Sequence, residues 1–188
     1  MARPDEKRSG LAGVTAAARQ APGRGLPPVH LWNPPHCGEI DILIRRDGVW
    51  MHEGSPIGRS ELVRLFSTVL RKDPDGYCLV TPVEKLTIRV EDLPFRAVSV
   101  ETRDGALVFT TDVGDEVEAG PDHPVVVETD PVSEEPSPRL RVRADLWARI
   151  ARPVFYELVE MAGTESGRLV VRSNGAAFPL GPAGADAA

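Results

Sequence analysis

The sequence has few cysteines, few aromatic residues and no long apolar run. Cys37 and Cys78 lie far apart and form no CxxC pair, so we expect two reduced thiols rather than a disulfide framework. Proline, glycine and arginine interrupt each short apolar run, which leaves no candidate for a secretory signal or a membrane span. We therefore expect a cytoplasmic protein that does not bind membranes.

The common catalytic and cofactor motifs are also missing. No GxSxG, GxGxxG, P-loop or HExxH pattern occurs, and the four histidines are scattered along the chain. The stretch VGDEVEAG at 113–120 resembles the turn of lipoyl and biotinyl carrier domains, but those domains need a modifiable lysine and none follows Lys85. We predict no cofactor, no metal site and no catalytic residue.

Charge divides the chain into a basic leader and an acidic body. Residues 1–28 carry five Lys/Arg against two Asp/Glu, whereas residues 29–180 carry 17 Lys/Arg against 25 Asp/Glu. An acidic body repels phosphate backbones, so we predict no nucleic-acid binding. With 41% hydrophobic residues the body can bury a core, and we expect residues 1–28 and 181–188 to be disordered.

The first half reads as a hairpin, a helix and two strands. Alternation at residues 40–44 predicts a strand, and Asp47-Gly48 predicts a tight turn in which both central residues have positive φ. Apolar residues at helical spacing predict a helix from Ser60, its N-cap, to Arg71 and Lys72, whose charges suit the carboxyl end of a helix. Strands are expected at 77–81 and 83–91, separated by Pro82.

The second half repeats some of these signals. A hairpin is expected around Arg103-Asp104-Gly105, and another around Asn174-Gly175. Residues 144–163 predict a second helix, capped by Asp145, kinked or divided at Pro153 and stopped at Gly163. Residues 112–138 contain nine Asp/Glu and no Lys/Arg, and we expect a strand near Val125–Val127 inside this acidic excursion.

These patterns predict an α+β fold made of two similar subdomains, at 29–95 and 96–180. The two Arg-Asp-Gly turns lie 57 residues apart and indicate duplicated hairpin-helix-strand units, although convergence of common hairpin signals remains an alternative. The candidate ligand-binding surface lies beside the stretch YCLVTPVEKLTIRVEDLPF at 77–95. Adjacent residues of a strand point to opposite faces, so Glu84 and Lys85 are poor partners for acid-base chemistry, and we expect Lys85 to face a ligand.

A compound signature runs through EGSPIGR, the LVRLF helix and DGYCLVTPVEKLTIRVEDLPF. On these residues the chain resembles, over roughly residues 30–180, the bacterial family catalogued as domain of unknown function 1285. The resemblance implies a duplicated α+β core with a pleckstrin-homology-like second half, a cleft between the halves that binds a small, nucleotide-like ligand, and a role in signalling. It carries over no catalytic residue.

We therefore expect a non-enzymatic module that binds a small anion in that cleft. The candidate ligand-binding residues combine aromatic walls, cations and the signature positions: Trp50, Arg59, Tyr77, Thr81, Glu84, Lys85 and Phe95. An alternative is a protein-interaction adaptor that uses exposed strand edges or the acidic excursion. An enzyme is the third alternative, and it would need Glu53 or Glu84 with a raised pKa in a closed pocket.

Overall fold

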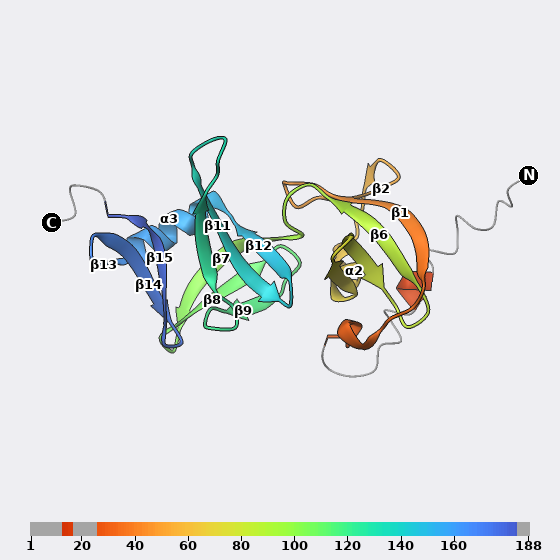
Figure 1. Ribbon diagram of the computed structural model, residues 1–188, viewed down its shortest axis with the longest axis horizontal. Helices are drawn as coiled ribbons and strands as arrows, with labels where there is room; N and C mark the ends of the chain where they lie inside the picture. Colours follow the sequence, from red (N-terminus) through yellow and green to blue (C-terminus); the bar gives the residue numbers. More distant parts are fainter. Residues whose placement is uncertain (1–12, 17–25, 184–188) are drawn as a thin grey trace, which may run out of the picture. The chain divides into compact units, whose positions relative to one another are not determined.

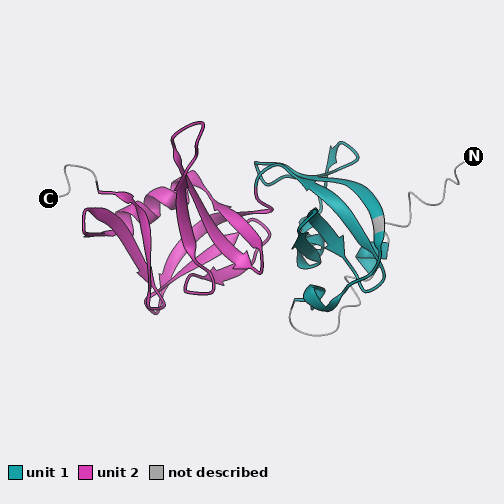
Figure 2. Ribbon diagram, viewed as in Figure 1, with its two compact units in different colours: residues 1–92 teal, residues 93–188 magenta. Residues whose placement is uncertain are grey.

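The computed structural model describes residues 13–16 and 26–183, and the chain divides into two compact units (Figure 2). Unit 1 is residues 1–92 and unit 2 is residues 93–188. The division falls after Asp92 because Phe95, expected to end the first half, opens the first strand of unit 2. Both units consist mostly of β-sheet with a few helices, in agreement with the α+β class (Figure 1).

Unit 1 contains one six-stranded sheet in the order β3-β2-β1-β6-β5-β4. Its strands are β1 (His36–Ile44), β2 (Trp50–His52), β3 (Ser55–Pro56), β4 (Leu70–Asp73), β5 (Gly76–Val80) and β6 (Lys85–Val90). Only β1 and β6 pair in parallel, and the other neighbours are antiparallel. The predicted strands on both sides of Pro82 are thus confirmed as β5 and β6.

The hairpin at Asp47-Gly48 is confirmed, but its predicted turn geometry is wrong. Gly48 has φ 88°, whereas Asp47 has no positive φ, because the last strand pair is Ile44 with Trp50 and five residues form the loop. The tight turn with two positive φ angles occurs instead at Asp104 (φ 52°) and Gly105 (φ 83°), where Arg103 pairs directly with Ala106.

The first helix is shorter than predicted. α2 (Ser60–Thr68) buries Phe66, and the chain leaves the helix at Val69 so that Leu70 can pair with Leu79 in the sheet. Arg71 and Lys72 therefore lie on β4, not at a helix end. Ser60 is not the N-cap, since the cap is Arg59, which forms no side-chain capping hydrogen bond. Sheet pairing outweighed the local helical pattern here.

The leader is partly ordered on unit 1. Residues 13–16 form a helical turn in which Val14 is fully buried, and η1 (Val29–Leu31) lies against β4. Residues 13–16 belong to the leader that was expected to be disordered, whereas η1 begins directly after it. Leader residues 1–12 and 17–25 and the tail from 184 lie outside the described residues.

Unit 2 contains a second six-stranded sheet in the order β10-β11-β12-β7-β8-β9, and a small sheet β13-β14-β15. The six strands are β7 (Phe95–Arg103), β8 (Ala106–Thr111), β9 (Glu116–Glu118), β10 (Val125–Thr129), β11 (Pro136–Arg143) and β12 (Leu146–Ile150). The small sheet comprises β13 (Gly163–Glu165), β14 (Arg168–Ser173) and β15 (Ala176–Pro182). The strand expected near Val125–Val127 is confirmed as β10, and the Asn174-Gly175 turn joins β14 to β15.

The second predicted helix is half strand. Residues Leu146–Ile150 form β12, which pairs with both β11 and β7, and α3 (Arg152–Met161) begins only afterwards. Pro153 lies in the first turn of α3, where its missing N–H costs nothing, so it starts the helix instead of kinking it. Asp145 is in a turn between strands and caps no helix, and Gly163 already belongs to β13.

The two large sheets have the same topology. In each, three antiparallel strands are joined to three more through a parallel pair between the first and the sixth strand, β1 with β6 and β7 with β12. The helices differ, because α2 follows the third strand of its sheet and α3 follows the sixth. The halves are thus similar in their sheets, while the predicted hairpin-helix-strand order holds only for the first. Among the described residues, no helix is both long and apolar enough to cross a bilayer.

Candidate functional site

The seven predicted ligand-binding residues do not come together on one surface. Trp50 is 2% exposed in the core of unit 1, and Phe95 is fully buried in the core of unit 2, so neither is available as a wall. Tyr77 and Lys85 lie on opposite faces of the sheet, since Tyr77 pairs with Ile88 while Lys85 pairs with Val80. The remaining three occupy the β5–β6 turn and the start of α2.

Thr81 and Glu84 shape the turn between β5 and β6. The buried Thr81 hydroxyl accepts hydrogen bonds from the amides of Val83 (3.3 Å) and Glu84 (3.1 Å), and it donates to the Glu84 carbonyl (3.3 Å). These bonds satisfy the backbone where Pro82 interrupts the strand. The Glu84 carboxyl lies against Gly13 of the leader, and burial raises the pKa of Glu84. Thr81 therefore has a structural role.

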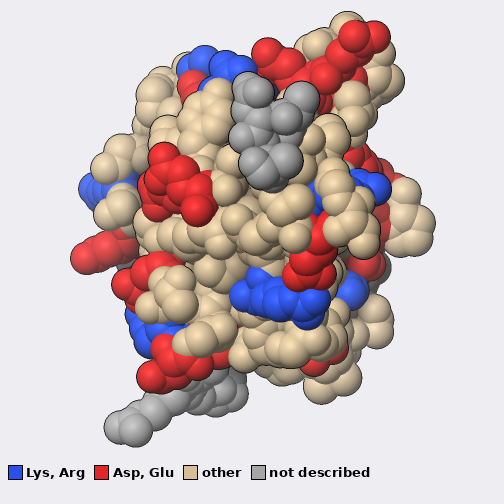
Figure 3. Space-filling view, turned by 90° about the vertical axis from the view of Figure 1, so that its left-hand side faces the viewer, with Lys and Arg blue, Asp and Glu red and all other residues tan. Residues whose placement is uncertain are grey.

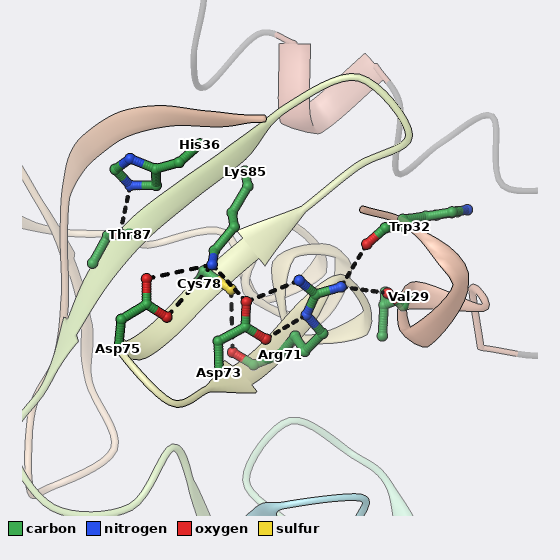
Figure 4. A network of polar contacts seen from close by, with 9 residues as sticks. All are labelled: Val29, Trp32, His36, Arg71, Asp73, Asp75, Cys78, Lys85 and Thr87. Atoms are coloured by element: carbon green, nitrogen blue, oxygen red, sulfur yellow. Dashed lines mark hydrogen bonds and ion pairs between the residues drawn. The ribbon is translucent and has the colours of Figure 1, made fainter. Parts of the chain in front are cut away.

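Lys85 is held by an ion-pair network that the sequence did not reveal (Figure 4). Its Nζ lies 2.6 Å from Asp73 Oδ2 and 3.4 Å from Asp75 Oδ2. Arg71 donates two hydrogen bonds to the same Asp73 carboxylate, from Nε at 2.7 Å and from Nη2 at 2.9 Å. The Arg71 Nη1 group also donates to the carbonyls of Val29 (2.9 Å) and Trp32 (2.6 Å), so the network anchors the segment 29–32, directly after the leader, to the sheet.

The network lowers the pKa of Asp73 to about 2, first because Arg71 donates hydrogen bonds to the carboxylate and then because Lys85 does. The neighbouring Cys78 is 1% exposed, and burial raises the pKa of its thiol to about 11. A thiol that is buried and protonated at neutral pH is a poor nucleophile. The cluster thus holds the fold together, and Lys85 is not a free cation for a ligand.

Tyr77 contributes to the other face of the sheet. The Lys72 Nζ sits 4.0 Å from the centre of the Tyr77 ring, which is a cation–π contact. Burial, and secondarily the Asp92 carboxylate, raises the pKa of the Tyr77 hydroxyl. The raised pKa keeps the Tyr77 hydroxyl neutral, and the contact with Lys72 holds the ring beside β4.

Arg59 is the predicted residue with the clearest binding geometry. It stands at the N-cap of α2 and, among the described residues, its guanidinium has no ion-pair or hydrogen-bond partner. The amides of Ser60 and Glu61 likewise donate to no acceptor within that part of the chain. A pocket of about 440 Å³ lies here, lined by Gly58, Arg59, Ser60, Glu61, Leu62 and Leu65. We call it the α2 pocket.

The α2 pocket combines an anion-binding end with an apolar side. Free amides at a helix N-terminus, its positive dipole end and a guanidinium all attract anions. The Glu61 carboxylate opposes this attraction in part. Leu62 and Leu65 supply apolar surface, and the volume lies within the range of small-molecule sites. The chemistry available is therefore binding and orientation of a small organic anion.

Unit 2 contains a second pocket that no sequence motif indicated. It has a volume of about 410 Å³ and is lined by β9, the turn at residues 120–123, Val142 and Asn174. Glu118 accepts a hydrogen bond from Asn174 Nδ2 (3.0 Å), and His123 bonds the Arg141 carbonyl through Nδ1 (3.1 Å). These polar groups are occupied by their protein partners.

Acidic and basic side chains alternate over the face shown in Figure 3, without one continuous patch of either sign.

Within the described ranges, no group of three or more His, Cys, Asp or Glu side chains lies close enough to hold a metal ion. His36 binds the Thr87 hydroxyl through Nε2 at 2.9 Å. Glu53, the other carboxylate considered for catalysis, is exposed in the turn between β2 and β3, with φ 48°.

Comparison with protein families gives two consecutive matches. Residues 27–93 match the N-terminal domain and residues 94–180 the C-terminal domain of DUF1285, both described as being of unknown function. The two matches meet one residue from the division between the units. No match was found among curated proteins.

Two solved structures are similar to this chain. A DUF1285 family protein from Silicibacter pomeroyi DSS-3 is 46% identical, with a TM-score of 0.81 over 90% of this chain and 95% of that one. A DUF1285 family protein from Shewanella baltica OS155 is 27% identical, with a TM-score of 0.52 over 63% of this chain and 90% of that one. The sequence signature and the fold therefore lead to the same family.

Proposed function

Because this chain belongs to the DUF1285 family, whose function is unknown, we propose from its own geometry that it is a non-enzymatic binding module for a small organic anion. The observation that carries the proposal is the α2 pocket, in which the Arg59 guanidinium stands beside two helix amides and none of these groups has a partner among the described residues. Of the seven residues first considered, Arg59 is the anion contact. The role is regulatory, with binding as the signal.

The ligand class follows from the two sides of the pocket. A phosphate or carboxylate fits Arg59 and the amides of Ser60 and Glu61, because each is a donor without a competing acceptor among the described residues. A ring or short apolar chain fits Leu62 and Leu65. A nucleoside monophosphate has both parts, and inorganic phosphate has only the first. We therefore expect adenosine 5′-monophosphate to bind more tightly than phosphate.

The test is a titration of the full chain with adenosine 5′-monophosphate, citrate and phosphate, followed by calorimetry and by the melting temperature. A ligand at 100 times its Kd stabilises a protein by about 2.7 kcal/mol, which is a shift of several degrees. Arg59→Gln should abolish the shift. The matched control is Arg64→Gln, an exposed arginine on the same helix that does not line the pocket, and it should leave the shift unchanged.

A third variant tests the charge argument with the opposite sign. Glu61→Gln removes the carboxylate that opposes the anion, so it should tighten binding by a few-fold. Equal affinities of the Arg59→Gln and native chains, or weaker binding by Glu61→Gln, would refute an anion site at α2. A metabolite panel without any shift would count against small-molecule binding altogether.

A protein-interaction adaptor is the second candidate, supported by the hairpin between β10 and β11. Its tip carries Val132, which is 92% exposed, next to the acidic Asp130, Glu134 and Glu135. An exposed apolar residue with an acidic rim fits a partner with a basic rim around an apolar hole. A photo-cross-linker at position 132 should then give one discrete adduct that is lost in Glu134→Lys. We also infer from the family resemblance that unit 2 is pleckstrin-homology-like.

A further inference from the structure

The leader segment at residues 13–16 is seated on unit 1 in an unusual way. It is a single helical turn whose one branched apolar side chain, Val14, is fully buried, while Ala16 is exposed two residues later. Gly13 approaches the Glu84 side chain, in the turn between β5 and β6, so closely that a Cβ added to it would overlap Glu84 Oε1. Figure 4 shows this turn above the loop that joins β5 to β6. The segment therefore docks through one side, with Gly13 and Val14 among its contact residues.

We propose that the surface of unit 1 beside Glu84 is a peptide-docking surface, and that the chain's own residues 13–16 occupy it reversibly. Its chemical preference is a glycine followed by a β-branched apolar residue and small residues, the pattern Gly-Val-Thr-Ala. Glycine is preferred where the backbone passes Glu84, because a Cβ there would have to displace the Glu84 carboxyl, and the branched residue fills the buried position. This proposal is independent of the α2 pocket.

Reversibility follows from how little the segment buries. Burying one valine offsets the ordering of roughly one or two residues, whereas the docked turn orders four. Such a segment stays docked mainly because it is tethered, which gives it an effective concentration on the order of millimolar. The other end of the tether is fixed, because Arg71 holds the carbonyls of Val29 and Trp32. A small change in either contact is thus enough to shift the equilibrium.

The experiment measures docking directly by thiol labelling. In a Cys37→Ser background, Val14→Cys places a reporter at the buried position and Ala16→Cys places the matched control at the exposed one. Cys78 can stay, because its burial and the raised pKa of its thiol keep it unreactive. With rates normalised to the urea-unfolded chain, we expect Val14→Cys to label about tenfold or more slowly than Ala16→Cys. Equal rates would overturn the docked state.

Competition then tests exchange. The synthetic peptide LAGVTAAARQ, which copies residues 11–20, should raise the Val14→Cys labelling rate several-fold at about 1 mM, the effective concentration it has to match. The same peptide with aspartate in place of valine should have no effect. Slow labelling that the peptide does not change would show a permanent part of the fold and overturn the proposal. Protection that grows with protein concentration would assign the occupant to a second copy and overturn the intramolecular assignment.

Discussion

Asp73→Asn should destabilise unit 1 by about 2.5 kcal/mol at neutral pH. The Asp73 carboxylate is 14% exposed and accepts hydrogen bonds from both Arg71 and Lys85, which lower its pKa from 3.8 to about 2. At about 1.4 kcal/mol per pKa unit, this depression gives the stated free energy. Asparagine has the shape of the protonated acid, so the substitution removes the charge and little else.

The same reasoning fixes the pH dependence. Since the pKa of Asp73 is depressed in the folded state, its contribution is complete above about pH 5 and is lost as the pH falls toward 2. Integration of the two titrations leaves about half of it, roughly 1.3 kcal/mol, at pH 3. The destabilisation caused by Asp73→Asn should therefore halve between pH 7 and pH 3.

Urea unfolding followed by tryptophan fluorescence measures this, in a Trp147→Phe background so that Trp32 and Trp50 report on unit 1. The control is Asp41→Asn, which breaks the ion pair of Asp41 with Arg89. That pair has the same 2.7 Å length as the Arg71–Asp73 pair, but its side chains are 54% (Asp41) and 69% (Arg89) exposed. An exposed pair contributes less than about 1 kcal/mol. Equal costs for the two variants, or a cost of Asp73→Asn that does not change with pH, would refute the network's role.

Three further outcomes are expected. Cys78 should resist iodoacetamide at pH 8 and react only after unfolding, as mass spectrometry can follow, because its pKa is raised to about 11 and its thiol is buried. Ser173→Ala should lower the free energy of unfolding of unit 2 by about 2 kcal/mol in urea, because the buried hydroxyl links β14 to β8 and to the Ala119 carbonyl. The control Ser99→Ala, at an exposed position, should leave the free energy of unfolding unchanged. Gly105→Ala should lower stability by about 1 kcal/mol because its φ is 83°, whereas Gly58→Ala, at a position without positive φ, should not.

Strand pairs and their turns could be predicted from the sequence because their signals are local. Alternating isoleucines placed β1, and the Asp104-Gly105 and Asn174-Gly175 dipeptides placed two tight turns with the required positive φ angles. Helix ends could not be predicted in the same way. Leu70 fits the helical spacing as well as it fits a strand, and only its pairing with Leu79 decides between them.

The candidate site was harder to predict from the sequence than the strands, because it depends on contacts between residues that are distant in the chain. The sequence indicated that Lys85 and Glu84 face opposite ways, but not that Asp73 and Asp75 neutralise Lys85 from a neighbouring hairpin. The helical spacing places Arg71 at a helix end, so the sequence could not predict its hydrogen bonds to the Asp73 carboxylate. Arg59 could be singled out because a helix start and its cap are consecutive in the chain.

The repeated topology explains why the turn signal was informative while the helix signal was not. The Arg-Asp-Gly turns at 46–48 and 103–105 both follow the first strand of their sheet, so their spacing reports the repeat. The helices are inserted at different points, and they give the units different binding potential. In unit 1 the N-terminus of α2 opens into a pocket beside Arg59, whereas α3 in unit 2 begins with Arg152 and Pro153, and proline has no amide to offer an anion. An anion site at a helix start is therefore expected at α2 and not at α3.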